Sequence, residues 1–162
     1  MMTLKTLVAA ALMVILAVAS PALAQKSTLP ESVTKPSTQR SMITKQLEMA
    51  MAEERRALSV FDQAASEEHI AIGHQAASNA YVLIRAAREG MFRIKGINSL
   101  HKRPEDPMLE IAFKKVTAAW NRSRAPVDRF HSAVKRADYL ETSRRQIGET
   151  ITMLEELLVI WM

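Results

Sequence analysis

The segment from Asp106 to Ala137 constrains the fold of this chain more than any other. Its apolar or small residues recur at alternating spacings of four and three positions, with one polar member. They are Leu109, Phe113, Val116, Trp120, Ser123, Val127, Phe130, Val134 and Ala137. Such spacing predicts one long amphipathic helix whose seam must be covered by other helices. Asp106 can cap its first turn, and Pro107 suits the first helical position.

Pro126 lies inside this predicted helix, where proline removes one backbone hydrogen bond and crowds the preceding turn. The apolar seam nevertheless keeps its phase on both sides of the proline. The pattern therefore favours a kinked but continuous helix. The alternative is a helix that ends near Ser123 and restarts at Pro126.

Three further segments carry an amphipathic pattern. The first spans about 41–65, with Leu47, Met51, Leu58, Phe61 and Ala65 on one stripe and Glu54 as its polar intruder. The second spans about 66–97, with Ile70, Gly73, Ala77, Ala80, Ile84, Ala87, Met91 and Ile94 on its seam. The last begins near Asp138, with Leu140, Ile147, Ile151, Leu154, Leu158 and Trp161 on its stripe. The small residues of the second seam predict that a neighbouring helix comes close.

The apolar stripe changes phase near Ser66 and again near Asp138, so both places predict a helix boundary. Ser66 precedes two glutamates and can cap a helix, while Asp138 and Glu141 resemble a capping box. Four helices of similar length, joined by one clear loop and two tight breaks, predict an all-α antiparallel up-down four-helix bundle. The alternative merges the helices in pairs into one long hairpin.

The N-terminus predicts export of the chain. Lys5 precedes a continuous apolar run over 7–18, and residues 22–24 offer the small-x-small site of a signal peptidase. We therefore expect a cleaved signal peptide at 1–24, a flexible Pro- and Ser-containing leader at 25–40 and the four-helix bundle at 41–162. The expected location is periplasmic or secreted. No later segment is long and apolar enough to span a membrane.

Composition excludes several kinds of chemistry. The chain has no cysteine, so thiol nucleophiles, cysteine zinc sites and covalent c-type haem are absent. Apart from Lys5 there are 21 basic and 17 acidic residues, an interleaved excess that favours an anion or an acidic surface over nucleic acid. No Glu is followed three residues later by His, as a di-iron bundle requires. We predict no metal, no cofactor and no enzyme activity.

Six cations gather near the end of the second predicted helix. They are Arg85, Arg88, Arg93, Lys95, Lys102 and Arg103. Cations near a helix C-terminus are favoured by the helix dipole and keep a surface soluble. The same cluster is also a candidate docking patch for an anionic partner.

Two passages carry a resemblance to a known family. Residues 39–47, Gln-Arg-Ser-Met-Ile-Thr-Lys-Gln-Leu, are similar to an Arg-Met-Leu-Ser-Gln-Arg-type box, and residues 105–127 contain Trp120 followed four positions later by Arg124. Both resemble the N-terminal domain family of nitrate sensors and type IV pili methyl-accepting chemotaxis transducers. The resemblance implies a PilJ-like four-helix sensory domain. This chain would be a free-standing version of it, without a second membrane span or a signalling module.

The resemblance also implies a ligand site. In this family the arginine of the box binds an oxyanion such as nitrate near a dimer axis. Matching Met42 to the methionine of the box puts Ser41 at the place of that arginine, with Arg40 one residue away. Lys45 and Gln46 occupy the polar positions that follow. The implied ligand-binding residues are therefore Arg40, Lys45 and Gln46.

Two functions follow from these observations as expectations. The first is an exported non-enzymatic sensor-type binding module for a small oxyanion or a protein partner, in chemotaxis-like or type IV pili-like signalling. The alternative is a structural or chaperone-like periplasmic helical protein that acts through an exposed apolar surface. The C-terminal residues 157–162 are apolar on every side and would provide such a surface toward a second copy or another protein.

Overall fold

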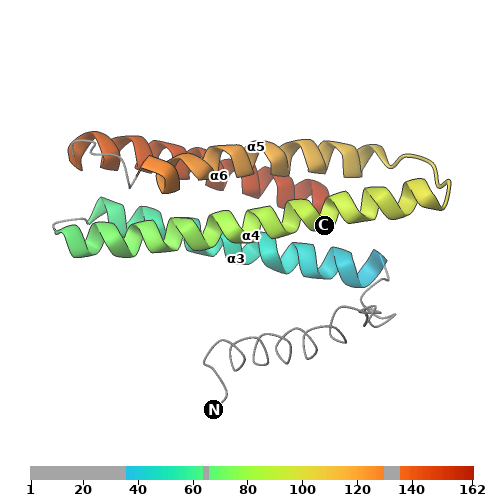
Figure 1. Cartoon of the computed structure of the whole chain (residues 1–162), viewed down its shortest axis with the longest axis horizontal. Helices are drawn as coiled ribbons and strands as arrows, with labels where there is room; N and C mark the ends of the chain where they lie inside the picture. The colour runs from blue at the N-terminus through green and yellow to red at the C-terminus, as the bar shows by residue number, and fades with distance from the viewer. Residues whose placement is uncertain (1–35, 64–65, 130–135) are drawn as a thin grey trace, which may run out of the picture. The chain divides into compact units, whose positions relative to one another are not determined.

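The computed structural model describes residues 36–63, 66–129 and 136–162, and these residues form four α-helices without a strand (Figure 1). The helices are α3 (Pro36–Asp62), α4 (Glu67–Leu100), α5 (Pro107–Arg129) and α6 (Arg136–Trp161). Helices α3 and α5 each pack against both α4 and α6. Consecutive helices run antiparallel, so the fold is the predicted all-α up-down four-helix bundle. The long paired hairpin is therefore wrong.

The first helix starts earlier than the sequence pattern predicts. Helix α3 begins at Pro36, so residues 36–40 of the expected leader belong to its first turns. Proline suits the start of a helix, because its missing N–H would have no partner there. The expected signal peptide, 1–24, and residues 25–35 of the leader lie outside the described residues.

Two predicted helix caps are confirmed. The Oγ of Ser66 accepts the backbone N–H of His69 at 3.3 Å, from an extended backbone conformation that stops α4 from starting earlier. The Oδ1 of Asp106 accepts the N–H groups of Met108 and Leu109 at 3.0 and 3.3 Å. These caps satisfy backbone donors that the first turn of each helix leaves free.

Helix α5 continues through Pro126, so the alternative that restarts a helix at the proline is wrong. Its predicted extension over 130–135, with Phe130 and Val134, lies outside the described residues, and Ala137 belongs to α6, which begins at Arg136, rather than to α5. Asp138 consequently lies inside the first turn of α6 and is not its N-cap. The connecting sequence contains no Gly or Pro, so the periodic pattern runs through it without a signal for the boundary.

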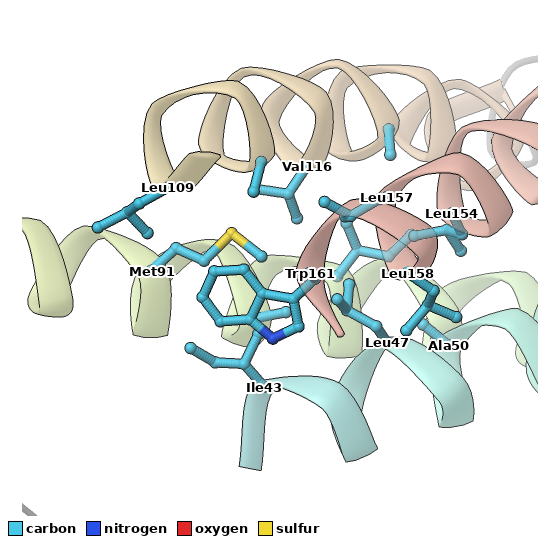
Figure 2. Close-up of a cluster of buried hydrophobic side chains, with 14 of the residues drawn as sticks. Ile43, Leu47, Ala50, Met91, Leu109, Val116, Leu154, Leu157, Leu158 and Trp161 are labelled. Carbon is cyan, nitrogen blue, oxygen red and sulfur yellow. The ribbon is translucent and has the colours of Figure 1, made fainter. Parts of the chain in front are cut away.

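The described core falls into two hydrophobic clusters. The larger contains Ile43, Leu47, Ala50, Ile84, Ala87, Met91, Ile94, Leu109, Ala112, Val116, Ala119, Leu154, Leu157, Leu158 and Trp161. Figure 2 shows it with side chains from all four helices, Trp161 lying near Ile43 and Met91. The smaller contains Ala57, Phe61, Ile70, Ala76, Ala77, Tyr139, Leu140 and Ile147. The larger cluster lies toward the end where α4 connects to α5.

The predicted seams differ in accuracy. All eight seam residues of α4 are buried, together with Ala76. In α5 the seam centre includes Ala112 and Ala119, while Phe113 and Trp120 lie half-buried at its edge. The sequence pattern missed the two alanines because alanine is only weakly hydrophobic. A large aromatic residue is strongly hydrophobic even at the edge of the seam, so the pattern placed it at the centre.

Glycine lets α3 and α4 approach closely, as the small-residue seam predicts. A Cβ built on Gly73 would lie 2.4 Å from Cε1 of Phe61, and one on Gly90 would lie 2.8 Å from Cγ1 of Ile43. Real side chains do not approach that closely, so any larger residue must displace the ring of Phe61 or the side chain of Ile43.

We expect Gly73→Ala to destabilise the protein. The new methyl group overpacks the contact with Phe61, at a cost of about 1–3 kcal/mol that exceeds the gain in helix propensity of roughly 1 kcal/mol. Gly96→Ala in the same helix is the matched control, because nothing lies within 4 Å of its Cβ. Urea unfolding should therefore show a lower midpoint for the first variant and an equal or higher one for the second. Equal stabilisation by both would contradict the close approach.

None of the described helices carries a stretch long and apolar enough to cross a membrane. The C-terminal segment contributes to the core with Leu157, Leu158 and Trp161, while Val159 and Met162 are exposed. Only part of its apolar surface is therefore open for another molecule.

Candidate functional site

The three residues implied by the family resemblance lie on α3 but do not converge. The Nη2 of Arg40 donates to Oδ2 of Asp106 at 3.0 Å, and its guanidinium carbon lies 5.0 Å from the ring centre of Trp161. Lys45 is exposed and Gln46 is half-buried. At 100° per residue, Lys45 and Gln46 leave the helix about 140° and 240° around from Arg40. A single site containing all three would need a second copy of the chain.

A different cation packs against two aromatic rings where α4 meets α5. The guanidinium carbon of Arg88 lies 4.9 Å from the ring centre of Trp120 and 5.5 Å from that of Phe113. Its Nε–H donates to Oγ1 of Thr117 at 3.2 Å. The rings and this hydrogen bond restrict the guanidinium group more than solvent would restrict an exposed arginine.

More rings and a second cation extend this arrangement along the two helices. The ring of Tyr81 stacks on that of Trp120, with ring centres 6.0 Å apart. The ring of Phe92 lies 6.2 Å from that of Phe113, and the Nζ of Lys95 lies 4.8 Å from the ring centre of Phe113. We call these six residues the α4–α5 aromatic face. They are Tyr81, Arg88, Phe92, Lys95, Phe113 and Trp120.

The charges on this face are unequally compensated. Lys95 forms an ion pair with Glu110, and its hydrogen bond holds the pKa of that carboxyl below the usual range. The neighbouring Arg85 pairs with Glu89 at 2.9 Å. Arg88 forms no ion pair with any carboxylate of the described residues. It is a half-buried positive charge without a negative partner in this part of the chain.

This arrangement can bind an oxyanion or a carboxylate. A guanidinium group recognises such anions through two N–H groups at its edge, while its faces stack on rings. The rings of Phe113 and Trp120 pack against the guanidinium group of Arg88 and do not use its N–H groups as an anion would. The indole Nε1 of Trp120 is also a buried donor without a hydrogen-bond partner among the described residues. Each of these groups gains from an anionic acceptor.

A second unusual feature lies inside the bundle. We call Glu54, Ala80, Ser123 and Thr150 the Glu54 layer. Each is at most 1% exposed, and the four come from α3, α4, α5 and α6 in that order. In three of the helices the layer residue lies between a residue of the smaller cluster and one of the larger. The flanking pairs are Ala57 and Ala50, Ala77 and Ile84, and Ile147 and Leu154.

The hydroxyl groups of the Glu54 layer are used within their own helices and leave Glu54 without a donor from them. The hydroxyl of Thr150 donates to the carbonyl of Gln146 at 2.8 Å, and that of Ser123 donates to the carbonyl of Trp120 at 3.0 Å. Oε2 of Glu54 has no hydrogen-bond partner among the described residues. Burial raises the pKa of Glu54 to about 8, so its neutral form is favoured at neutral pH. The sequence pattern marked this residue as the polar intruder on the α3 stripe.

The histidines are not gathered into a metal site within the described residues. Nδ1 of His69 lies 2.7 Å from the Oγ of Ser66, as part of the cap of α4. No group of three His, Cys, Asp or Glu side chains in the described ranges is arranged to hold a metal ion.

Comparison with known proteins gives no relative: no family model, no curated protein and no solved structure matches this chain. The resemblance to the nitrate-sensor family therefore stays a proposal.

Proposed function

We propose that this chain is a non-enzymatic four-helix binding module that holds a small oxyanion or carboxylate on the α4–α5 aromatic face. The observation that carries the proposal is Arg88, a half-buried guanidinium packed against two rings without a carboxylate partner among the described residues. A half-buried charge loses hydration without compensation, so an anion that pairs with it is favoured.

The α4–α5 aromatic face is better suited to a free anion than the box on α3. Arg40 already pairs with Asp106 and stacks on Trp161, so an anion would have to compete with a carboxylate of the same chain. Lys45 is an exposed cation on a flexible side chain, which must lose rotamer freedom when it binds. Arg88 is already held in place, so its binding loses less entropy.

A sensory role and an exported location remain parts of the same proposal. The apolar run and small-residue site at 1–24 support export, and the resemblance of residues 39–47 and 105–127 supports a sensor of the nitrate and type IV pili type. A protein partner in signalling would then bind the ligand-bound state in preference to the free state. The alternative of a structural or chaperone-like protein is supported by the exposed side chains of Val82 and Phe92.

Isothermal titration of the mature protein with nitrate, nitrite, sulfate and acetate tests the proposal. We expect one of these anions to bind and Arg88→Ala to weaken its affinity about 10- to 100-fold, as for a lost charged hydrogen bond of roughly 1.5–3 kcal/mol. Arg85→Ala is the matched control, because this arginine on the same helix has Glu89 as its partner.

The variants Arg40→Ala and Lys45→Ala test the α3 box in the same experiment. Loss of binding in these variants alone would move the anion site to α3 and contradict the assignment to Arg88. Absence of heat for every anion would remove the anion proposal and favour a protein partner.

A further inference from the structure

The Glu54 layer divides the interior of the bundle into two halves. On one side, the larger cluster continues to the α4–α5 loop, where Arg40, Asp106 and Trp161 join three parts of the chain. On the other side, the smaller cluster holds together the end of α3, the start of α4 and the start of α6. Because the layer interrupts the apolar contacts, the two halves can lose their packing separately.

No cation is present among the described buried residues at the level of Glu54 to stabilise its negative charge. On α4 the buried residues at this level are Ala77 and Ala80, on α5 it is Ser123, and on α6 they are Gln146 and Thr150. None of them ionises, and both hydroxyl groups already donate to backbone carbonyls. Gln146 presents a buried carbonyl oxygen without a hydrogen-bond partner among the described residues.

Ionisable groups elsewhere on these helices are paired on the surface or lie away from this level along the helix. Glu149 of α6 pairs with Arg122 of α5 at 3.0 Å on the surface. His74 of α4 lies six positions before Ala80, about 9 Å along the helix. Tyr139 is the other buried ionisable side chain of the described core; its hydroxyl donates to the carbonyl of Pro126, in the smaller cluster. The closed bundle thus fits a protonated Glu54 and opposes an ionised one.

We propose that ionisation of Glu54 opens the smaller-cluster half of the bundle to water while the larger-cluster half stays folded. Opening at this side lets water reach the carboxylate, and only the packing of the smaller cluster is lost. Besides the apolar packing, two side chains make polar cross-helix contacts in the described part of this half, and neither forms a buried ion pair. Tyr139 reaches the carbonyl of Pro126, and the half-buried Arg144 reaches the carbonyl of Phe61 and the exposed Asp62. The opposite half keeps the larger cluster and the Asp106 cap of α5.

Amide hydrogen exchange of the whole protein, followed by NMR at about pH 6 and about pH 9 and corrected for the intrinsic exchange rate, tests this proposal. Amides of 70–77 and 140–147 should lose protection on the order of 100-fold, because opening releases a carboxyl whose pKa is about 8 in the closed state and 4.5 when exposed. Amides of 84–94 and 154–158 should keep their protection.

Two variants make the result specific. Glu54→Gln cannot ionise, so its protection should not depend on pH in either half. Glu53→Gln is the matched control, because this neighbouring glutamate is half-buried and lies 3.9 Å from Arg56; it should behave as the original chain does. Equal loss of protection in both halves, no loss in either, or a pH response that survives in Glu54→Gln would each overturn the proposal.

Discussion

At about pH 9, the variant Glu54→Gln should be more stable than the original protein by up to roughly 5 kcal/mol. The carboxyl has a pKa of about 8 in the folded chain and 4.5 when exposed, because burial opposes its charge. Glutamine has nearly the same shape but never ionises. This energy is an upper value, since local opening around Glu54 would reduce the cost of burying its negative charge.

The sign of the pH dependence distinguishes Glu54 from an ordinary paired carboxylate. Below about pH 4.5 the side chain is protonated in both states and does not affect stability through its charge. Between about pH 4.5 and pH 8 the unfolded chain releases a proton that the folded chain keeps, so stability falls as the pH rises. The Gln variant should lack this decrease and lose its advantage near pH 5.

Urea unfolding at a series of pH values measures this effect, with Glu53→Gln as the control for the loss of one carboxylate. A variant whose advantage is the same at about pH 5 and pH 9 would show that Glu54 is not buried and neutral. A variant that is less stable at every pH would show that its carboxylate has a stabilising partner in solution.

Trp161→Ala should lower the free energy of unfolding by about 3–5 kcal/mol, although the residue is the last but one in the chain. The indole is only 6% exposed, packs in the larger cluster and stacks with the guanidinium group of Arg40. The expected loss comes from the cavity and from the lost contact between α3 and α6. Figure 2 shows this ring among the side chains that close the larger cluster.

Removal of Met162 is the matched control for Trp161→Ala, because that side chain is 83% exposed at the adjacent position. Its deletion should leave the thermal midpoint nearly unchanged. If both changes have the same small effect, the C-terminal turn of α6 is frayed and does not contribute to the core.

Helical periodicity was enough to predict the four helices, because apolar stripes mark one face of each helix and change phase between helices. It predicted the buried seam of α4 and the unusual position of Glu54. It did not predict that α6 begins at Arg136, because apolar residues over 130–137 continue the stripe without a Gly or Pro to mark a boundary. It also assigned Phe113 and Trp120 to the centre of the buried seam in place of Ala112 and Ala119. Large apolar residues dominate the pattern when the neighbouring helices are unknown.

The α4–α5 aromatic face could not be predicted in the same way. Arg88 belongs to the predicted basic cluster, but the sequence alone does not distinguish it from Arg85 and Lys95. The difference depends on the register of α4 against α5, which gives Lys95 an acidic partner and Arg88 two rings. Periodicity within one helix contains no information about that register.

The central claim, an anion held by Arg88, can be tested with the two tryptophans of the chain as reporters. Trp120 contacts Arg88 and Trp161 contacts Arg40, so each indole reports on one of the two rival anion sites. We predict that titration with the bound anion shifts the indole N–H signal of Trp120 in a ¹H–¹⁵N spectrum and leaves that of Trp161 unchanged. A shift of Trp161 alone, or of neither signal, would contradict the claim.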